Sequence, residues 1–123
     1  MDPKKCLIGP SKDLRECEKG IRFDILFQDG TMVQGFVVRF NGKVFGYKNR
    51  CTHVGINLDW GNGKFFNSNK KFLICSTHGA LYNPVDGACH AGPCNGNGLT
   101  KLNIVENEDN IYVLCDGEIL NVG

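Results

Sequence analysis

Long apolar runs and an excess of either charge are both missing from this sequence of 123 residues. No segment approaches the roughly 18 consecutive apolar residues that a membrane-spanning helix requires, so we expect no membrane partner. Lys and Arg number 14 against 13 Asp and Glu, and a net charge of +1 gives no general reason to expect nucleic acid as a partner. Residues 1–13 are charged and lack the apolar core of a signal peptide, which predicts a cytoplasmic protein.

Proline is also scarce, with 4 residues, whereas glycine numbers 16. Phenylalanine and β-branched residues between the glycines favour short strands joined by tight turns over helices. With 41 % hydrophobic and 22 % charged residues the composition is that of a globular protein, and the length predicts one domain over residues 1–123. Phosphate-binding glycine motifs and nucleophile elbows are absent from the sequence, so neither motif indicates an enzyme.

The regular part of the pattern predicts strands and hairpins. Apolar and polar residues alternate over Ile21 to Gln28, as in a strand with one buried face. The turn dipeptides Asp29-Gly30 and Asn41-Gly42 then predict two hairpins. Before residue 21 the predicted element is a single helical turn that begins near Ser11. The further predicted strands are Met32 to Phe40, Lys43 to Tyr47, Leu99 to Val105 and Ile111 to Cys115.

Residues 48–98 differ from both flanks because turn residues dominate them, among them Gly61-Asn62-Gly63 and Asn95-Gly96-Asn97-Gly98. A loop-rich insert framed by strands is where a β domain usually carries its function. The chain has seven cysteines, an odd number that disulfides alone cannot use up, so some must be free thiols or metal ligands. The cysteines are Cys6, Cys17, Cys51, Cys75, Cys89, Cys94 and Cys115.

Two pairs of metal-ligand residues lie within the insert, Cys51-Thr52-His53 and Cys75-Ser76-Thr77-His78. Two thiolates and two imidazoles suit zinc or an iron–sulfur centre. Zinc fingers usually group cysteine with cysteine and histidine with histidine, whereas each loop here supplies one sulfur and one nitrogen. This division suits two bridged metals, one bound by both sulfurs and the other by both nitrogens.

The extended pairs Cys51-Thr52-His53-Val54-Gly55 and Cys75-Ser76-Thr77-His78-Gly79, followed by Gly92-Pro93, resemble the Rieske [2Fe-2S] motif. The resemblance implies one [2Fe-2S] cluster per chain, with Cys51 and Cys75 on the inner iron and His53 and His78 on the outer iron. It implies that the Gly92-Pro93 loop covers the cluster from a third side. It also implies an all-β fold of three antiparallel sheets, with a base domain and a loop-rich cluster-binding subdomain at about residues 48–98.

Some positions depart from the Rieske proteins of quinol-oxidising complexes. Ile56 and Thr77 stand where those proteins have two cysteines that form a disulfide, and Ala80 replaces a serine that hydrogen-bonds a bridging sulfide. Tyr82 matches their tyrosine that donates to a ligand sulfur. Donors to the sulfurs stabilise the reduced cluster and raise its potential. With one of two hydroxyl donors present, we expect a potential low in the Rieske range of about −150 to +300 mV, and no quinol oxidation.

The resemblance also implies a function. We expect a monomeric, soluble Rieske-type ferredoxin that carries single electrons from a reductase to a terminal oxygenase, as small members of the family do in ring-hydroxylating systems. Such a protein is a carrier and not an enzyme, so no residue is predicted to be catalytic. The ring nitrogens of His53 and His78 that iron does not use are predicted to face solvent, where they offer the electron its exit and couple reduction to pH.

Two alternatives stay open. The chain would also suit the small Rieske subunit of a multi-subunit reductase that resembles nitrite reductase. The other alternative is a zinc-stabilised or redox-sensing interaction module without an electron-transfer partner.

The remaining cysteines are interpreted structurally. Cys89 and Cys94 are predicted to be packing thiols, because the cluster is already fully ligated, and alternative ligands or a loop disulfide stay open for them. His90 is predicted to be a solvated loop histidine, and Trp60 to fill core. Three further cysteines show no partner-like spacing, and the last of them ends a predicted strand as a small apolar residue: Cys6, Cys17 and Cys115.

Charge is unevenly distributed along the chain. Glu106 to Glu118 holds five acids and no base. Solvated faces are the preferred interpretation, and the alternative hypothesis is a basic collar near the cluster that steers an acidic redox partner. The segment from Lys43 to Lys71 holds one acidic residue, Asp59, and six basic residues: Lys43, Lys48, Arg50, Lys64, Lys70 and Lys71.

Overall fold

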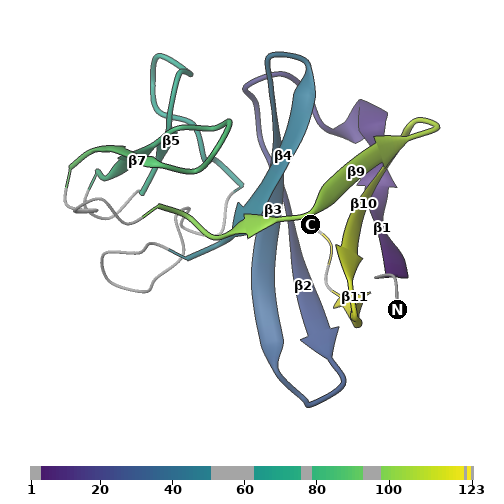
Figure 1. Cartoon of the computed structure of the whole chain (residues 1–123). Helices are drawn as coiled ribbons and strands as arrows, with labels where there is room; N and C mark the ends of the chain where they lie inside the picture. The colour runs from purple at the N-terminus through teal and green to yellow at the C-terminus, as the bar shows by residue number, and fades with distance from the viewer. Residues whose placement is uncertain (1–3, 51–62, 76–78, 93–97, 121, 123) are drawn as a thin grey trace.

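The computed structural model describes residues 4–50, 63–75, 79–92, 98–120 and 122. These residues form three antiparallel sheets, as predicted, and one short 3-10 turn at Ser11–Asp13 (Figure 1). The first sheet has the order β1 (Lys4–Pro10), β10 (Asn110–Cys115), β9 (Ile104–Asn107). The second has the order β11 (Gly117–Leu120), β2 (Ile21–Phe27), β3 (Met32–Phe40), β4 (Lys43–Lys48), β8 (Lys101–Leu102). The third has the order β5 (Leu73–Ile74), β6 (Leu81–Tyr82), β7 (Cys89–Ala91).

The predicted meander forms β2, β3 and β4, with bounds within one residue of those expected. At its second turn Asn41 and Gly42 have φ angles of 53° and 77°, the backbone that a two-residue hairpin turn requires. The carboxylate of Glu16 accepts hydrogen bonds from the backbone N–H groups of Asn41 and Gly42, at 2.6 and 2.8 Å. The N-terminal segment therefore holds this turn in place.

The strands β1 and β11 have no counterpart in the sequence prediction. In β1, Cys6 and Ile8 are buried, but Leu7 between them is 54 % exposed, so apolar residues occupy both faces and hide the alternation. Each of the two strands pairs with a partner from the opposite end of the chain, β1 with β10 and β11 with β2. The pairing is long-range and carries no local sequence signal.

The predicted strand Leu99 to Val105 is instead two strands in two sheets, β8 and β9. The chain passes from the second sheet to the first at Asn103, whose carbonyl accepts a hydrogen bond of 2.9 Å from the N–H of Leu114. Apolar and polar residues continue to alternate across Asn103, so the sequence pattern alone predicts one strand.

Strand β3 separates two apolar cores. Val37 packs into the base core between the first two sheets, whereas Phe36 and Val38 face the core beneath the third sheet. Phe36 stacks on Phe65, with ring centroids 3.9 Å apart. Both faces of this strand are therefore buried, and the second core fixes the third sheet on the base. Within the described ranges, no helix has the length and apolar character that a crossing of the membrane would need.

Candidate metal centre

Cys75 follows β5 directly and is fully buried. The strands β5 and β6 pair as a hairpin, with Ile74 opposite Leu81. The turn is closed by two backbone hydrogen bonds, from the N–H of Cys75 to the carbonyl of Ala80 at 2.9 Å and from the N–H of Gly79 to the carbonyl of Cys75 at 2.8 Å. The hairpin therefore holds the Cys75 backbone at its tip.

A third segment meets this tip. Strand β7 pairs with β6, and the register of Leu81 with Ala91 brings Gly92 beside the start of β6. Gly92 has a φ of +90°, and a Cβ atom at this position would lie 3.0 Å from the Cα atom of Ala80 and 3.2 Å from the carbonyl oxygen of Gly79. Glycine is required here by both its backbone angle and its close approach. The structure thus places Gly92 against Gly79 and Ala80, which follow the second predicted ligand pair, while Pro93 lies outside the described residues.

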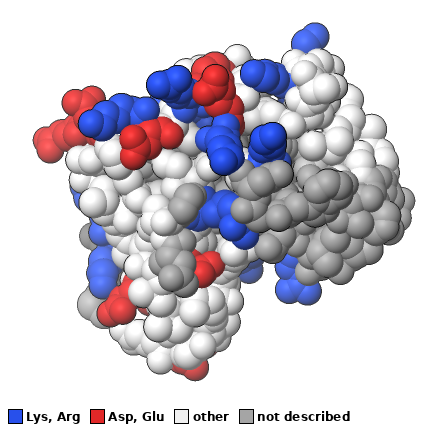
Figure 2. Space-filling view, turned by 180° about the vertical axis from the view of Figure 1, so that it is seen from behind, with Lys and Arg blue, Asp and Glu red and all other residues white. Residues whose placement is uncertain are grey.

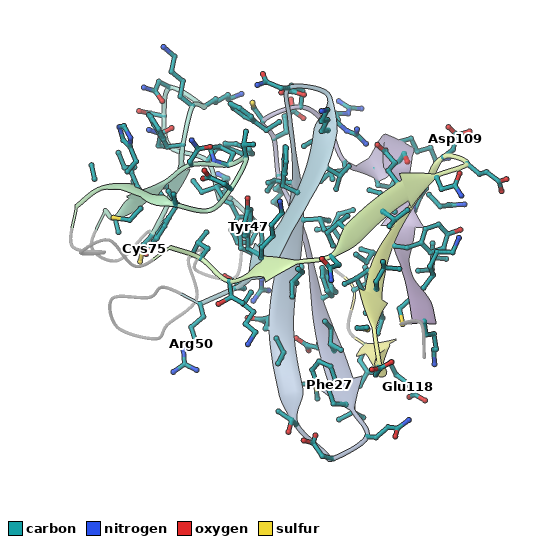
Figure 3. The ribbon with its side chains drawn as sticks, viewed as in Figure 1. Phe27, Tyr47, Arg50, Cys75, Asp109 and Glu118 are labelled. Atoms are coloured by element: carbon teal, nitrogen blue, oxygen red, sulfur yellow. The ribbon has the colours of Figure 1, made fainter. Side chains whose placement is uncertain are left out.

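The chain reaches the first predicted ligand loop from β4. Asn49 is 2 % exposed, and its N–H donates a hydrogen bond of 2.8 Å to the carbonyl of Gln34. Arg50 is exposed and points away from the third sheet in Figure 3. Of the four predicted ligands the structure describes Cys75, whereas Cys51, His53 and His78 lie outside the described residues. The assembly of all four stays a prediction, and Trp60 and Cys94 also lie outside the described ranges.

Tyr82 and Ala80 are both fully buried in the apolar cluster that contains Cys75. Leu73, two residues before Cys75, pairs with Tyr82 across the hairpin. The methyl side chain of Ala80 offers no hydrogen-bond donor. The role of Tyr82 as a donor to a ligand sulfur stays a prediction.

The sequence analysis predicted no role for Tyr47. The hydroxyl of Tyr47, on β4, donates a hydrogen bond of 2.7 Å to the carbonyl oxygen of Pro84, in the loop between β6 and β7. Burial, assisted by the nearby carboxylate of Asp86, raises the pKa of Tyr47 above its ordinary value. Figure 3 shows Tyr47 between the second and third sheets. The signal available in the sequence was the buried face of β4, which does not reveal a partner in another sheet.

The loop that carries Pro84 is itself closed by hydrogen bonds. The side-chain oxygen of Asn83 accepts a hydrogen bond of 2.9 Å from the N–H of Val85. The backbone carbonyl of Asn83 accepts a hydrogen bond of 2.7 Å from the N–H of Gly87. The carbonyl of Gly87 in turn accepts from the N–H of Leu99 at 2.8 Å. This rigid loop gives the Tyr47 hydroxyl a fixed acceptor.

Two predictions for the β7 region need correction. Cys89 is disulfide-bonded and not a packing thiol, and its partner lies outside the described residues. A full ligand set leaves no place for Cys89 on the metal, but it does not prevent a disulfide bond between Cys89 and another cysteine. His90 is exposed as predicted, but it lies on strand β7 and stacks on Phe72, with ring centroids 4.0 Å apart.

The six basic residues of the collar hypothesis lie at different places. Lys43 begins β4 and Arg50 follows its end, which separates them by roughly 20 Å at the usual rise of a strand. Lys64 and Lys70 instead line a groove of about 230 Å³ with Lys19. On the face shown in Figure 2, acidic and basic side chains alternate along the upper edge. These positions favour solvated faces over one continuous collar.

The three sheets, the loop-rich segment between β4 and β8, and the buried Cys75 at a hairpin tip define a small β protein with one predicted metal ligand in place. A soft sulfur donor in an apolar, water-excluding site suits an iron–sulfur cluster. The chain belongs to the Rieske [2Fe-2S] domain family, whose model matches residues 5–113. Membership assigns it one [2Fe-2S] cluster and decides between zinc and iron–sulfur in favour of the latter.

Solved structures share this fold. The ferredoxin of carbazole 1,9a-dioxygenase from Nocardioides aromaticivorans IC177 is 23 % identical with a TM-score of 0.72, over 91 % of this chain and 98 % of that one. The Sphingomonas yanoikuyae B1 ferredoxin is 17 % identical with a TM-score of 0.68, over 90 % and 98 %. A chain from the complex of reduced oxygenase and oxidised ferredoxin in carbazole 1,9a-dioxygenase is 20 % identical with a TM-score of 0.69, over 95 % and 97 %. No curated protein has a matching sequence.

Proposed function

We propose that this protein is a Rieske-type ferredoxin that accepts single electrons from a reductase and passes them to a terminal oxygenase. The observation that supports this function best is the extent of the likeness to the Nocardioides ferredoxin, which covers 91 % of this chain and 98 % of that one. That ferredoxin serves carbazole 1,9a-dioxygenase, and a further similar chain comes from a complex of oxygenase with ferredoxin. We assign the same kind of partner to this chain.

For the cluster we assign Cys51 and Cys75 as ligands of the inner iron, and His53 and His78 as ligands of the outer iron. When bound, the cluster supplies one-electron oxidation and reduction. The chain itself holds the Cys75 backbone through the hairpin bonds to Ala80 and Gly79 and excludes water with the apolar residues around it. A reduced cluster with two thiolate and two neutral imidazole ligands carries a single negative charge, which such a site tolerates when backbone N–H groups are near.

The first experiment is electron paramagnetic resonance of protein purified without oxygen and reduced with dithionite, together with its iron content. We expect two irons per chain and a rhombic signal whose average g lies below that of all-cysteine [2Fe-2S] ferredoxins. Cys75→Ser removes a predicted ligand and should abolish the signal, whereas the matched control Cys17→Ser, at a half-buried thiol outside the predicted ligand set, should retain it. An unaltered signal in Cys75→Ser would remove Cys75 from the ligand set.

The second experiment tests the carrier role. Reduced protein is mixed in a stopped-flow instrument with the terminal oxygenases of its host, and the absorption of both clusters is followed. Transfer of one electron per chain to an oxygenase supports the proposed function. A permanent complex with a large reductase on size-exclusion chromatography, without transfer to any oxygenase, would instead identify the subunit of a multi-subunit reductase.

A further inference from the structure

The base of the molecule brings together two cysteines from opposite ends of the chain. The Sγ atoms of Cys6 on β1 and Cys115 on β10 lie 3.5 Å apart, and both are free thiols. The two strands are antiparallel neighbours, with Lys4 opposite Cys115 and Cys6 opposite Val113. The cysteines are therefore diagonal neighbours across one strand pair, on adjacent strands in Figure 1.

This geometry is close to that of a disulfide. The S–S bond is about 2.05 Å long, so the two sulfurs need to approach by roughly 1.5 Å. Because diagonal neighbours in an antiparallel pair lie farther apart than directly opposite residues, closure combines rotation of the side chains with a small movement of the two strands. The antiparallel pairing already fixes the two backbones side by side, because β1 and β10 pair at residues on both sides of Cys6. Sγ of Cys6 also lies 3.3 Å from the carbonyl oxygen of Gly117, which keeps it beside β10 and β11.

We propose that Cys6 and Cys115 form a thiol oxidation site, which closes to a disulfide between β1 and β10 by exchange with a small disulfide of the glutathione class. The site goes beyond the proposed function. It lies in the base core, whereas Cys75 lies in the other core. Oxidation at this pair therefore leaves the predicted cluster ligands unchanged.

Burial sets the order of the exchange. Cys6 is 7 % exposed, whereas Cys115 is half-buried, so the external disulfide meets Cys115 first. Residues that flank the pair, Lys4, Asp116 and Gly117, line a groove of about 570 Å³ through which a small solute can approach this side.

The external disulfide is written R–S–S–R, where R–SH is the small thiol. In the first step the thiolate of Cys115 attacks one sulfur of R–S–S–R. The S–S bond of the reagent breaks, one R–S⁻ leaves and takes up a proton, and Cys115 carries a mixed disulfide. In the second step Cys6 gives up its proton and its sulfur attacks Sγ of Cys115, which releases the second R–S⁻ as a thiol. One R–S–S–R is reduced to two R–SH while the two cysteine thiols are oxidised to one disulfide.

The second step is slow at neutral pH. In the dithiol, burial, the hydrogen bond with Cys115 and the charge on Cys115 raise the pKa of Cys6 to about 11, while Lys4 lowers it and Asp116 raises it. In the mixed disulfide the two contributions of Cys115 are lost, and burial remains the main cause that raises the pKa of Cys6. The thiolate of Cys6 is therefore a small fraction of the total at pH 7, and closure should accelerate as pH rises. The local geometry compensates in part, because the attacking sulfur already lies beside its target.

The experiment uses the wild-type protein with its cluster, equilibrated without oxygen in buffers of increasing glutathione disulfide to glutathione ratio. Free thiols are trapped with N-ethylmaleimide, and peptides are identified by mass spectrometry. We expect a cross-linked peptide pair that contains Cys6 and Cys115, and the oxidised protein to melt at least roughly 5 °C higher, since a disulfide that closes almost the whole chain restricts the unfolded state. Cys17, a half-buried free thiol elsewhere, is the internal control and should form at most a mixed disulfide with glutathione.

Single substitutions test whether the rise in melting temperature comes from this pair of cysteines or from another thiol. Cys115→Ser should abolish the rise in melting temperature, and Cys17→Ser should retain it. If Cys6 stays open to alkylation at every ratio, or if Cys115 stops as a stable mixed disulfide with glutathione, the proposal is wrong. The visible absorption of the cluster is recorded in the same samples, so a failure of cluster assembly is distinguished from a failure of this site.

Discussion

The hydroxyl of Tyr47 and the carbonyl oxygen of Pro84, 2.7 Å apart, join the second sheet to the loop of the third. Tyr47 is fully buried, and its ring packs with Phe36, at a centroid distance of 6.0 Å, in the same core as Cys75. The predicted ligands Cys51 and Cys75 follow β4 and β5, which belong to these two different sheets. The bond therefore contributes to the placement of β4, which precedes Cys51, relative to the sheet whose hairpin tip carries Cys75.

Replacement of Tyr47 by Phe removes the donor and leaves the carbonyl of Pro84 buried without it. We expect the free energy of unfolding to fall by about 1–2 kcal/mol. Urea denaturation followed by circular dichroism measures the change. The matched control is Tyr112→Phe, at a half-buried tyrosine on β10. Equal losses in the two variants would show that the Pro84 bond has no special weight.

Gly92→Ala tests the close approach of the third loop to the hairpin tip. The added Cβ would lie 3.0 Å from the Cα atom of Ala80, and backbone atoms cannot move aside cheaply. Gly30→Ala is the matched control, because Gly30 has nearly the same φ, +88°, and nothing within 4 Å of an added Cβ. We expect Gly92→Ala to be the less stable variant by about 1 kcal/mol or more, and to bind less iron per chain.

Thermal unfolding and iron analysis of both variants decide the matter. If Gly30→Ala loses as much stability and as much iron as Gly92→Ala, the backbone angle alone explains the loss and the contact with Ala80 does not.

An ion pair in the base predicts an acid-dependent loss of stability. The guanidinium of Arg39 donates to both carboxylate oxygens of Glu106, at 2.6 and 3.2 Å. This hydrogen bonding holds the pKa of Glu106 below its ordinary value of 4.5. The stabilisation is therefore fully present above about pH 4.5 and is lost as the pH falls through the lower pKa of the folded state.

Glu106→Gln should accordingly be less stable than the wild type by about 0.5–1 kcal/mol at pH 7, because the pair is partly exposed and screened. The difference should shrink as the pH falls below 4.5. Urea midpoints between pH 3 and 7 measure it, with Glu108→Gln as a control at an exposed turn residue. A difference that stays constant over this range would contradict the ionic explanation.

The sequence predicted the central meander because its signals are local. Alternation marks β2, and the Asn41-Gly42 dipeptide marks the turn that the structure confirms with two positive φ angles. The strands β1 and β11 were missed because their pairing partners lie at the other end of the chain. For the same reason the contact between Cys6 and Cys115 has no counterpart in the spacing of the cysteines.

At the candidate metal centre the sequence predicts the ligand residues better than the contacts between sheets that position them. The two Cys-His pairs are local motifs, and the family match agrees with the cofactor that they implied. The tether from Tyr47 to Pro84 and the contact of Gly92 with Ala80 depend on how sheets pack together. For Cys89 the sequence favoured a packing thiol and left a loop disulfide open as an alternative, because composition and spacing cannot decide which thiols come into contact.

Tyr82→Phe should lower the midpoint potential of the cluster without removing it. Tyr82 is buried with Cys75 in one apolar cluster, and it matches the family's tyrosine that donates to a ligand sulfur. A lost neutral hydrogen bond of about 0.5–1.5 kcal/mol corresponds to a fall on the order of 20–60 mV for a one-electron couple. Protein-film voltammetry measures the potential, and Tyr112→Phe serves as the control outside the cluster core. An unchanged potential in Tyr82→Phe, with two irons still bound, would show that the hydroxyl is directed elsewhere and that other donors tune this centre.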